Sequence, residues 1–281
     1  MILTIRSAAG EMRLVDGVAL LQAEGLHGLN RATHTIDQAT SDGTVLVGSK
    51  VQSRSVRLRV KLRRDVVAAR NDIIRICAQK DMTLVLNRGA STYVMPCTAQ
   101  GVSHEAQDGS KITIALYVPI PYWRAEIAKT VWIAGWSAAF EFPVEIPEEG
   151  IEFGTRTETR VVNVKNDGSV ETGCIIAFSA RSNVTNPAVY MAANSARYIR
   201  IITSMSAGDV VTINTARGQN AAQLTIYRAA TGETGNAFSL LDTGSEFLQI
   251  APGDNLIRYD AETGADALDV SITIDELYAG V

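Results

Sequence analysis

Ser-Val-Arg-Leu-Arg-Val-Lys-Leu-Arg, residues 55–63, alternates apolar and basic side chains without interruption. In an extended chain the apolar members share one face: Val56, Leu58, Val60 and Leu62. The basic members share the opposite face: Arg57, Arg59, Lys61 and Arg63. A period of two maintained over nine residues predicts a β-strand with one buried face.

The residues after this strand predict one helix. Asp65 is a suitable N-cap, because an aspartate side chain accepts a hydrogen bond from an unpaired amide of the first helical turn. Apolar residues then recur at helical spacing to about residue 79: Val66, Ala69, Ile73, Ile76 and Cys77.

Two further strand signals complete the first half of the chain. Residues 83–86 and 92–97 flank Asn87-Arg88-Gly89, which predicts a hairpin. Residues 111–118 alternate again and place one apolar set on one face: Ile112, Ile114, Leu116 and Val118. We therefore predict an α+β domain over residues 1–125, rich in strands and with one helix.

Residues 126–155 are predicted to form an ordered connector. Prolines are concentrated around it, at positions 119, 121, 143 and 147, and proline breaks both helices and strand ladders. All three tryptophans lie within it or just before it: Trp123, Trp132 and Trp136. Because large apolar side chains are poorly solvated, we expect short strands here rather than a flexible linker.

Residues 156–281 predict an all-β domain. Short β-rich runs follow one another: 159–165, 173–180, 198–203, 210–215, 223–227, 247–250, 255–259 and 267–277. Asn166-Asp167-Gly168 predicts a tight hairpin, and Pro252-Gly253-Asp254-Asn255 predicts a further turn. Short strands at this spacing are typical of a β-sandwich or jelly roll.

The composition is that of a folded protein. Of 281 residues, 46% are hydrophobic and 20% charged, which excludes wholesale disorder. Residues 1–130 contain 17 Lys/Arg against 11 Asp/Glu, whereas residues 131–281 contain 9 against 19. This asymmetry is typical of two bodies in different surroundings, and the basic half is too weakly charged for a typical nucleic-acid binder. The chain has neither a secretory signal nor an apolar stretch of the roughly 18 residues that span a bilayer, so we expect cytoplasmic folding without membrane insertion.

The sequence carries no convincing catalytic or metal-binding motif. Residues 43–50 approach a phosphate-binding loop, but Ser49 and Lys50 are exchanged and a strand is expected to follow instead of a helix. The acidic residues 260–269 lack the spacing of a calcium-binding EF-hand. Three cysteines and three histidines, all widely spaced, argue against a disulfide scaffold and a metal enzyme. We predict no catalytic residue, no cofactor and no metal.

The basic strand and the tryptophans form the candidate interface. Four like charges on one face repel each other, and an acidic partner would relieve this, although simple solvation explains the same pattern. Exposed strand edges invite pairing between chains, so we expect Val56–Leu62 and Ile112–Val118 to pair between subunits. Tryptophan is enriched where subunits meet. The candidate contact residues are Val56, Arg57, Leu58, Arg59, Val60, Lys61, Leu62, Arg63, Ile112, Ile114, Leu116, Trp123, Trp132 and Trp136.

Taken in order, these features resemble the distal tail proteins of siphophages, the phages with long, non-contractile tails. The first half carries the Asp42-Gly43 loop, the patterned strand with its helix, and the Pro-Tyr-Trp-Arg element at Pro121–Arg124. The second half carries Val164–Gly168, Cys174–Phe178 and Gly244–Ile257, the last close to the family's "strand, Pro-Gly-x-Asn, strand" ending. The family often has proline where this chain has Cys174.

The resemblance implies an architectural protein of the virion tail tip, assembled in the host bacterial cytoplasm. Family members form homo-hexameric rings through the N-terminal domain. The ring joins the tail tube protein to the tail-tip protein, which is similar to a tail-associated lysin, and genome DNA passes through its lumen without specific binding. The C-terminal sandwich, galectin-like in shape, points outward and is a place for receptor-binding proteins.

The alternative function is a carbohydrate-binding adhesion module that recognises a host cell-surface glycan. Tyrosines of the second half would stack on the sugar rings: Tyr190, Tyr198, Tyr227 or Tyr259. Their exposure is not readable from the sequence, and an aromatic content of 6% is low for a dedicated sugar binder. A cell-wall hydrolase, the third function considered, needs an organised pair of catalytic groups that the sequence does not contain.

Overall fold

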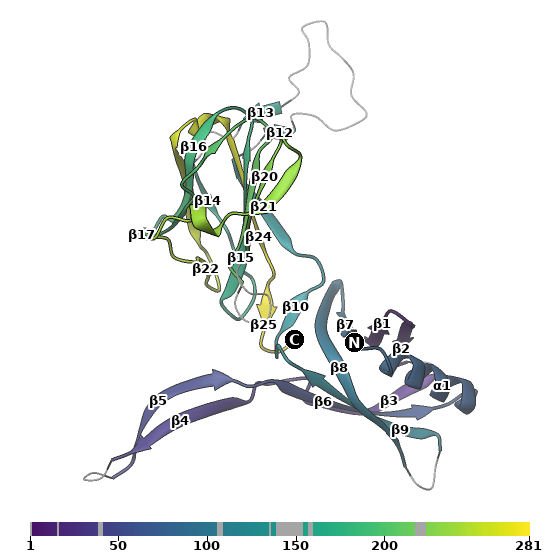
Figure 1. Ribbon diagram of the computed structural model, residues 1–281. Helices are drawn as coiled ribbons and strands as arrows, with labels where there is room; N and C mark the ends of the chain where they lie inside the picture. Colours follow the sequence, from purple (N-terminus) through teal and green to yellow (C-terminus); the bar gives the residue numbers. More distant parts are fainter. Residues whose placement is uncertain are drawn as a thin grey trace, which may run out of the picture. The chain divides into compact units, whose positions relative to one another are not determined.

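The computed structural model describes residues 2–15, 17–38, 42–105, 109–134, 136–138, 154–156, 160–216 and 223–281, with the backbone alone at 134, 136–138 and 154–156. The chain divides into two compact units (Figure 1). The first comprises Met1–Glu126 together with Leu277–Val281, and the second comprises Ile127–Glu276. The last five residues therefore belong to the first unit, which the sequence analysis does not anticipate.

The first unit is built on an antiparallel nine-stranded sheet. Its main path runs β2-β1-β7-β8-β9-β6-β3, and β10 pairs with both β8 and β25. The strands are β1 Ile2–Ser7, β2 Gly10–Arg13, β3 Val18–Glu24, β6 Arg54–Leu62, β7 Met82–Arg88, β8 Ser91–His104, β9 Lys111–Val118, β10 Trp123–Ala125 and β25 Leu277–Tyr278. One helix of the described residues, α1 Val66–Cys77, follows β6.

The alternation of β6 builds the core of this unit, as predicted. Its four apolar side chains are at most 2% exposed: Val56, Leu58, Val60 and Leu62. They share one hydrophobic cluster with Ile73 and Ile76 of α1. The helix begins after Asp65, whose carboxylate accepts a hydrogen bond from the Ala68 amide at 3.2 Å, so the predicted N-cap is confirmed.

The C-terminal residues 277–281 close the first unit. Leu277 and Tyr278 pair with β10, and the Tyr278 ring meets Tyr93 edge-on at 5.1 Å. The buried Arg54 donates from Nη1 to the Leu26 carbonyl at 2.6 Å and from Nη2 to the Ala279 carbonyl at 2.9 Å. A guanidinium buried against carbonyls thus holds the end of the chain to the sheet.

A separate two-stranded sheet belongs to the first unit. It consists of β4 Arg31–Asp37 and β5 Thr44–Val51, which pair with each other and with no other described strand. Figure 1 shows this hairpin extending beyond the edge of the unit's main sheet.

The second unit is a β-sandwich. One sheet has seven strands in the path β11-β24-β15-β19-β20-β21, with β22 beside β15, and the other has five in the path β14-β23-β16-β17, with β18 beside β16. The strands are β11 Lys129–Ala134, β12 Trp136–Ala138, β13 Gly154–Arg156, β14 Val161–Asn163, β15 Thr172–Ala180, β16 Val184–Met191, β17 Asn194–Arg200, β18 Ser204–Met205, β19 Val210–Asn214, β20 Gln223–Arg228, β21 Glu233–Asn236, β22 Gln249–Ile250, β23 Leu256–Thr263 and β24 Leu268–Ile274. Strands β12 and β13 pair with each other.

Inward-facing side chains of the two sheets form the sandwich core. The seven-stranded sheet contributes Phe178, Ile213 and Ile272, and the five-stranded sheet contributes Val189, Ile199 and Ile257. The predicted fold class, a β-rich α+β domain followed by an all-β sandwich, is confirmed.

Two asparagines organise the turns at which the chain passes between the sheets. The buried Asn166 donates from Nδ2 to the carbonyls of Val170 and Ile250, each at 3.1 Å. Its backbone forms a bridge with Gly253, which has φ 91° and needs the freedom of glycine. Asn255 donates from Nδ2 to the Ala251 carbonyl at 2.8 Å and to the Gly253 carbonyl at 3.1 Å.

The tight hairpin predicted at Asn166-Asp167-Gly168 is therefore wrong. Strands β14 and β15, which flank it, lie in different sheets, so this segment crosses the sandwich. The Asn166 side chain, which also accepts from the Gly168 amide at 2.9 Å, makes an Asx-type turn that sequence alone does not distinguish from a hairpin turn. The turn predicted at Pro252–Asn255 is confirmed.

Candidate functional site

The apolar residues of the predicted interface lie in the core of the first unit. Besides those of β6, three side chains of β9 are fully buried: Ile112, Ile114 and Leu116. Strand β6 pairs with β3 and β9, and β9 pairs with β6 and β8. The expectation that Val56–Leu62 and Ile112–Val118 are free edges is thus wrong. Alternation reports a buried face, but it does not tell a central strand from an edge strand.

Two of the four basic side chains of residues 55–63 form ion pairs within the chain. Arg57 Nη1 lies 3.4 Å from Glu24 Oε2 on β3, and Arg59 forms an ion pair with Glu105. Lys111 Nζ lies 3.6 Å from the other carboxylate oxygen of Glu105. These carboxylates relieve the like-charge repulsion, for which the sequence left both solvation and an acidic partner open. Lys61 and Arg63 are exposed. A contact of this basic face with another chain would therefore use these two exposed side chains.

The tryptophans lie in three different settings. Trp123 is fully buried and donates from Nε1 to the Leu26 carbonyl at 3.1 Å, so its side chain belongs to the core of the first unit. Trp132, on β11 at the edge of the sandwich, is 62% exposed and stays a candidate contact residue. The side chain of Trp136 lies outside the described residues, as does most of the predicted connector 126–155.

The β4–β5 hairpin carries an exposed apolar group that the sequence analysis missed. Its members are between 44% and 62% exposed: Ile36, Val45, Leu46 and Val47. Ile36 and Val45 are direct cross-strand partners, and a register shift follows at His34/Thr35. The signal in the sequence is the apolar run 45–47, which follows Asp42-Gly43-Thr44 within the segment that resembles a phosphate-binding loop. No helix follows that segment, as expected, but the segment itself forms strand β5 and not the loop that the glycines suggest.

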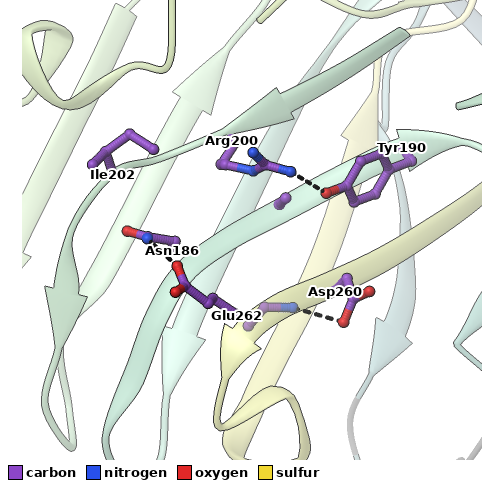
Figure 2. Close-up of a pocket in the computed structure, with 8 residues that line it drawn as sticks. Asn186, Tyr190, Arg200, Ile202, Asp260 and Glu262 are labelled. Carbon is purple, nitrogen blue, oxygen red and sulfur yellow. Dashed lines mark hydrogen bonds between the residues drawn. The ribbon is translucent and has the colours of Figure 1, made fainter. Parts of the chain in front are cut away.

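A pocket of about 350 Å³ lies on the outward face of the five-stranded sheet of the second unit (Figure 2). Its main lining residues come from β16, β17 and β23: Asn186, Ala188, Tyr190, Arg200, Asp260 and Glu262. The sequence analysis considers Tyr190 as a sugar-stacking residue and the acidic stretch with Asp260 and Glu262 as a calcium loop, but it does not predict that these residues meet in one pocket. The alternation of β23 continues to Thr263, beyond the run 255–259, and it is this continuation that turns Asp260 and Glu262 outward.

Hydrogen bonds connect the walls of this pocket. Arg200 Nη2 donates to Tyr190 Oη at 2.8 Å, and Asn186 Nδ2 donates to Glu262 Oε2 at 2.6 Å. The guanidinium of Arg258 lies over the Tyr190 ring, with Cζ 4.8 Å from the ring centroid. The hydrogen bond to Tyr190 raises the pKa of Arg200, which is therefore a cation at every physiological pH.

The four tyrosines of the alternative function do not share one surface. Tyr190 and Tyr198 are cross-strand partners at the pocket, with ring centroids 5.7 Å apart. Tyr227 is 39% exposed on β20 of the other sheet, and Tyr259 is buried in the sandwich core. Two causes raise the pKa of Tyr198: burial, and the carboxylate of Asp242, which accepts a hydrogen bond from the Tyr198 hydroxyl at 3.2 Å.

The described residues contain no group of three His, Cys, Asp or Glu side chains placed to hold a metal ion. Burial raises the pKa of the Cys77 and Cys174 thiols to about 11 and that of Cys97 to about 12. Thiols with such pKa values are weak nucleophiles at neutral pH. The described part of the chain has no helix long and apolar enough to cross a membrane. The neighbouring carboxylates of the connector, which the sequence does not predict to act as a glycosidase pair, lie outside the described residues: Glu148, Glu149 and Glu152.

A comparison with known protein families matches part of the second half of the chain. Residues 167–278 match the siphovirus-type tail component, C-terminal domain. A search of curated protein sequences finds no match.

Solved structures match over the full length. The crystal structure of the SPP1 Dit (gp 19.1) protein, described as a paradigm of hub adsorption apparatus in Gram-positive-infecting phages, covers 99% of this chain, which covers 99% of it, at TM-score 0.66 and 13% identity. The activated phage P2 baseplate with Ca contains a chain that matches at TM-score 0.53 and 12% identity, with 100% and 99% of the two chains covered. The same baseplate with Sr gives TM-score 0.52 and 11% identity over the same shares. Residues 167–278 are thus similar to the siphovirus-type tail component C-terminal domain, and the whole chain has the fold of the SPP1 hub adsorption protein.

Proposed function

We propose that this chain is a structural hub of a siphophage tail, which closes into a homo-hexameric ring through its first unit. The ring joins the tail tube protein to the tail-tip protein, and genome DNA passes through its lumen without specific binding. The second unit holds receptor-binding proteins. The protein assembles in the host cytoplasm and remains in the virion. The observation that carries this proposal is the match of both units, in the same order, to 99% of the SPP1 hub protein.

The β4–β5 hairpin supports the ring and suggests how it closes. An isolated two-stranded hairpin is only marginally stable in water, and this one pairs with no other described strand. Its apolar group, Ile36 with Val45–Val47, is exposed in the single chain. Both features are expected of an element that packs on the next copy. Six identical head-to-tail contacts of this kind close when the rotation per subunit is one sixth of a turn.

Substitution of the hairpin tests this mechanism. We expect Ile36→Glu with Val45→Glu, which changes two cross-strand partners on one face of the hairpin, to abolish the ring. Each buried Ile or Val contributes roughly 1.5–3 kcal/mol per contact, and a buried unpaired carboxylate adds a further cost. The native mass should fall to that of a monomer, while the far-ultraviolet circular dichroism spectrum stays that of the wild type.

Thr35→Glu with Thr44→Glu is the matched control, since it adds the same two negative charges to the same hairpin at exposed polar positions. It should leave the ring intact. A ring that persists in Ile36→Glu with Val45→Glu excludes the hairpin as the contact, and loss of the ring in both variants would point to charge rather than apolar burial.

A further inference from the structure

The pocket of the second unit is built by three rows of side chains that cross the five-stranded sheet. The first row consists of Tyr198, Tyr190 and Arg258. The second row consists of Arg200, Ala188 and Asp260. In the second row Ala188 stands between Arg200 and Asp260. Ala188 is 1% exposed yet lies outside the sandwich core cluster, so its methyl group is the floor of the pocket. A small residue between two long ones creates the hollow.

The third row includes a backbone outlier. Asn186 has φ 50°, one of two described non-glycine residues with positive φ. This conformation places its amide against Glu262, to which it donates at 2.6 Å, as Figure 2 shows. A non-glycine residue in the left-handed conformation costs conformational free energy inside a strand, and residues in such unfavourable conformations are concentrated at functional sites.

The polar groups are held in position before any ligand arrives. Tyr190 is fixed from one side by the hydrogen bond from Arg200 and from the other by the guanidinium of Arg258. The guanidinium of Arg200 in turn lies over the Tyr198 ring, with Cζ 5.2 Å from its centroid. Side chains that are already ordered lose little entropy when a ligand binds.

Neighbouring arginines offset the carboxylates in and beside the pocket. Arg160 Nη1 lies 3.6 Å from Asp260 Oδ1, and Arg258 Nη1 lies 4.0 Å from Asp260 Oδ2. Arg200 Nη1 lies 3.6 Å from Asp242 Oδ2. With charges of both signs this close, the pocket has no strong field of either sign. It therefore favours a neutral ligand over an ion.

The lining defines the chemistry of that ligand. Guanidinium and amide donors stand beside carboxylate acceptors over a floor of methyl groups, and a tyrosine ring forms one wall. A neutral polyol presents donors and acceptors together with aliphatic C–H faces, which matches this lining. The volume of about 350 Å³ is near the lower end of ligand pockets, about 300–1,000 Å³. We propose that the pocket formed by Asn186, Ala188, Tyr190, Arg200, Asp260 and Glu262 binds one or two rings of a neutral saccharide.

This site goes beyond the hub function and does not depend on the ring. It is tested with the full chain by titration with D-glucose, D-galactose, N-acetyl-D-glucosamine and L-rhamnose, followed by saturation-transfer NMR and calorimetry. Glucuronate is the anionic comparison. We expect at least one neutral sugar to bind saturably and to bind more tightly than glucuronate. Failure of all four neutral sugars to bind, or binding of glucuronate alone, overturns the proposal.

Two variants place the binding at this pocket. Ala188→Leu fills the floor, and we expect it to weaken binding by about tenfold or more. Ala177→Leu makes the same change on the outward side of β15 in the other sheet and should not affect binding. Arg200→Gln, which keeps the floor but removes the cation, should weaken binding by a similar factor. Binding that survives both Ala188→Leu and Arg200→Gln lies elsewhere and contradicts the assignment.

Discussion

Asp209 is a buried carboxylate that accepts three hydrogen bonds within the second unit. The donors are the Ser206 amide at 3.0 Å, the Ala229 amide at 2.9 Å and Arg228 Nη1 at 2.8 Å. Burial acts to raise the pKa of Asp209, but these donors outweigh it, and the pKa lies below the ordinary 3.8. The ionised form is therefore the one that the fold stabilises.

We expect Asp209→Asn to destabilise the second unit by about 1–3 kcal/mol near neutral pH, because charged hydrogen bonds are lost and donors are left unpaired. A depressed pKa in the folded state contributes stability above the unfolded-state pKa, and this stability disappears as pH falls through the folded-state pKa. The difference between variant and wild type in calorimetric unfolding should therefore shrink below pH 3.8. Exposed Glu233→Gln is the control, and a pH-independent difference would contradict the assignment.

Single residues were predictable only where their role is local. Asp65 caps α1 because capping depends on the next three residues, all of which the sequence displays. Asn166 and Asn255 stand out in the sequence as turn formers. Their buried hydrogen bonds to carbonyls far along the chain depend on the packing of the sandwich, which no local pattern reports.

At the level of elements, a substitution in β6 tests the predicted role of this strand in the sheet of the first unit. Val60 pairs with Leu20 of β3 and Ile112 of β9. We expect Val60→Pro to destabilise this unit by about 3 kcal/mol or more, because proline removes a ladder hydrogen bond in a central strand. Hydrogen exchange followed by mass spectrometry should show loss of protection across β3, β6 and β9.

Leu21→Pro is the matched comparison. Leu21 is 49% exposed and lies at the register shift of β3, an edge strand of the described sheet. Leu21→Pro should destabilise the first unit much less than Val60→Pro, because bulges on edge strands tolerate proline. A soluble ring with normal protection in Val60→Pro would contradict the place of β6 in the sheet.

Periodic strands were predictable, whereas strands with turn residues were not. β9 has the predicted bounds 111–118, since its alternation is complete. β16 was missed, because Asn186-Pro187 reads as a turn. The structure keeps Pro187 in the strand: its carbonyl still accepts from the Ile201 amide at 3.0 Å. The pocket could not be predicted without β16, because Ala188, which forms its floor, and Asn186, which has positive φ, both lie on that strand.

At the scale of the whole molecule, the division into units and the place of the C-terminal residues depend on contacts between distant parts of the chain. The texture of the sequence indicated two bodies, and the structure has two units. The return of residues 277–281 to the first unit joins β25 to β10, a pairing across more than half of the chain. Hydrophobic periodicity carries no information about such a pairing.

The response of the assembly to salt distinguishes its two candidate contact surfaces. The basic side chains of β6 are partly paired with Glu24 and Glu105 within the chain, whereas the apolar group of the hairpin is uncovered. Exposed charge pairs weaken over a screening length of about 10 Å at 0.1 M salt, while apolar burial does not. We expect the ring population, followed by analytical ultracentrifugation, to be unchanged or to rise with added salt. A fall would place the basic face in the contact.

The proposed hub function depends most directly on closure of the first unit into a ring. The decisive measurement is the native mass of the full chain across a concentration series, with negative-stain images of the largest species. We predict a species of six times the 30.2 kDa chain mass, ring-shaped and with a central opening. A chain that remains a monomer at every concentration, or closes with another number of subunits, would contradict the account.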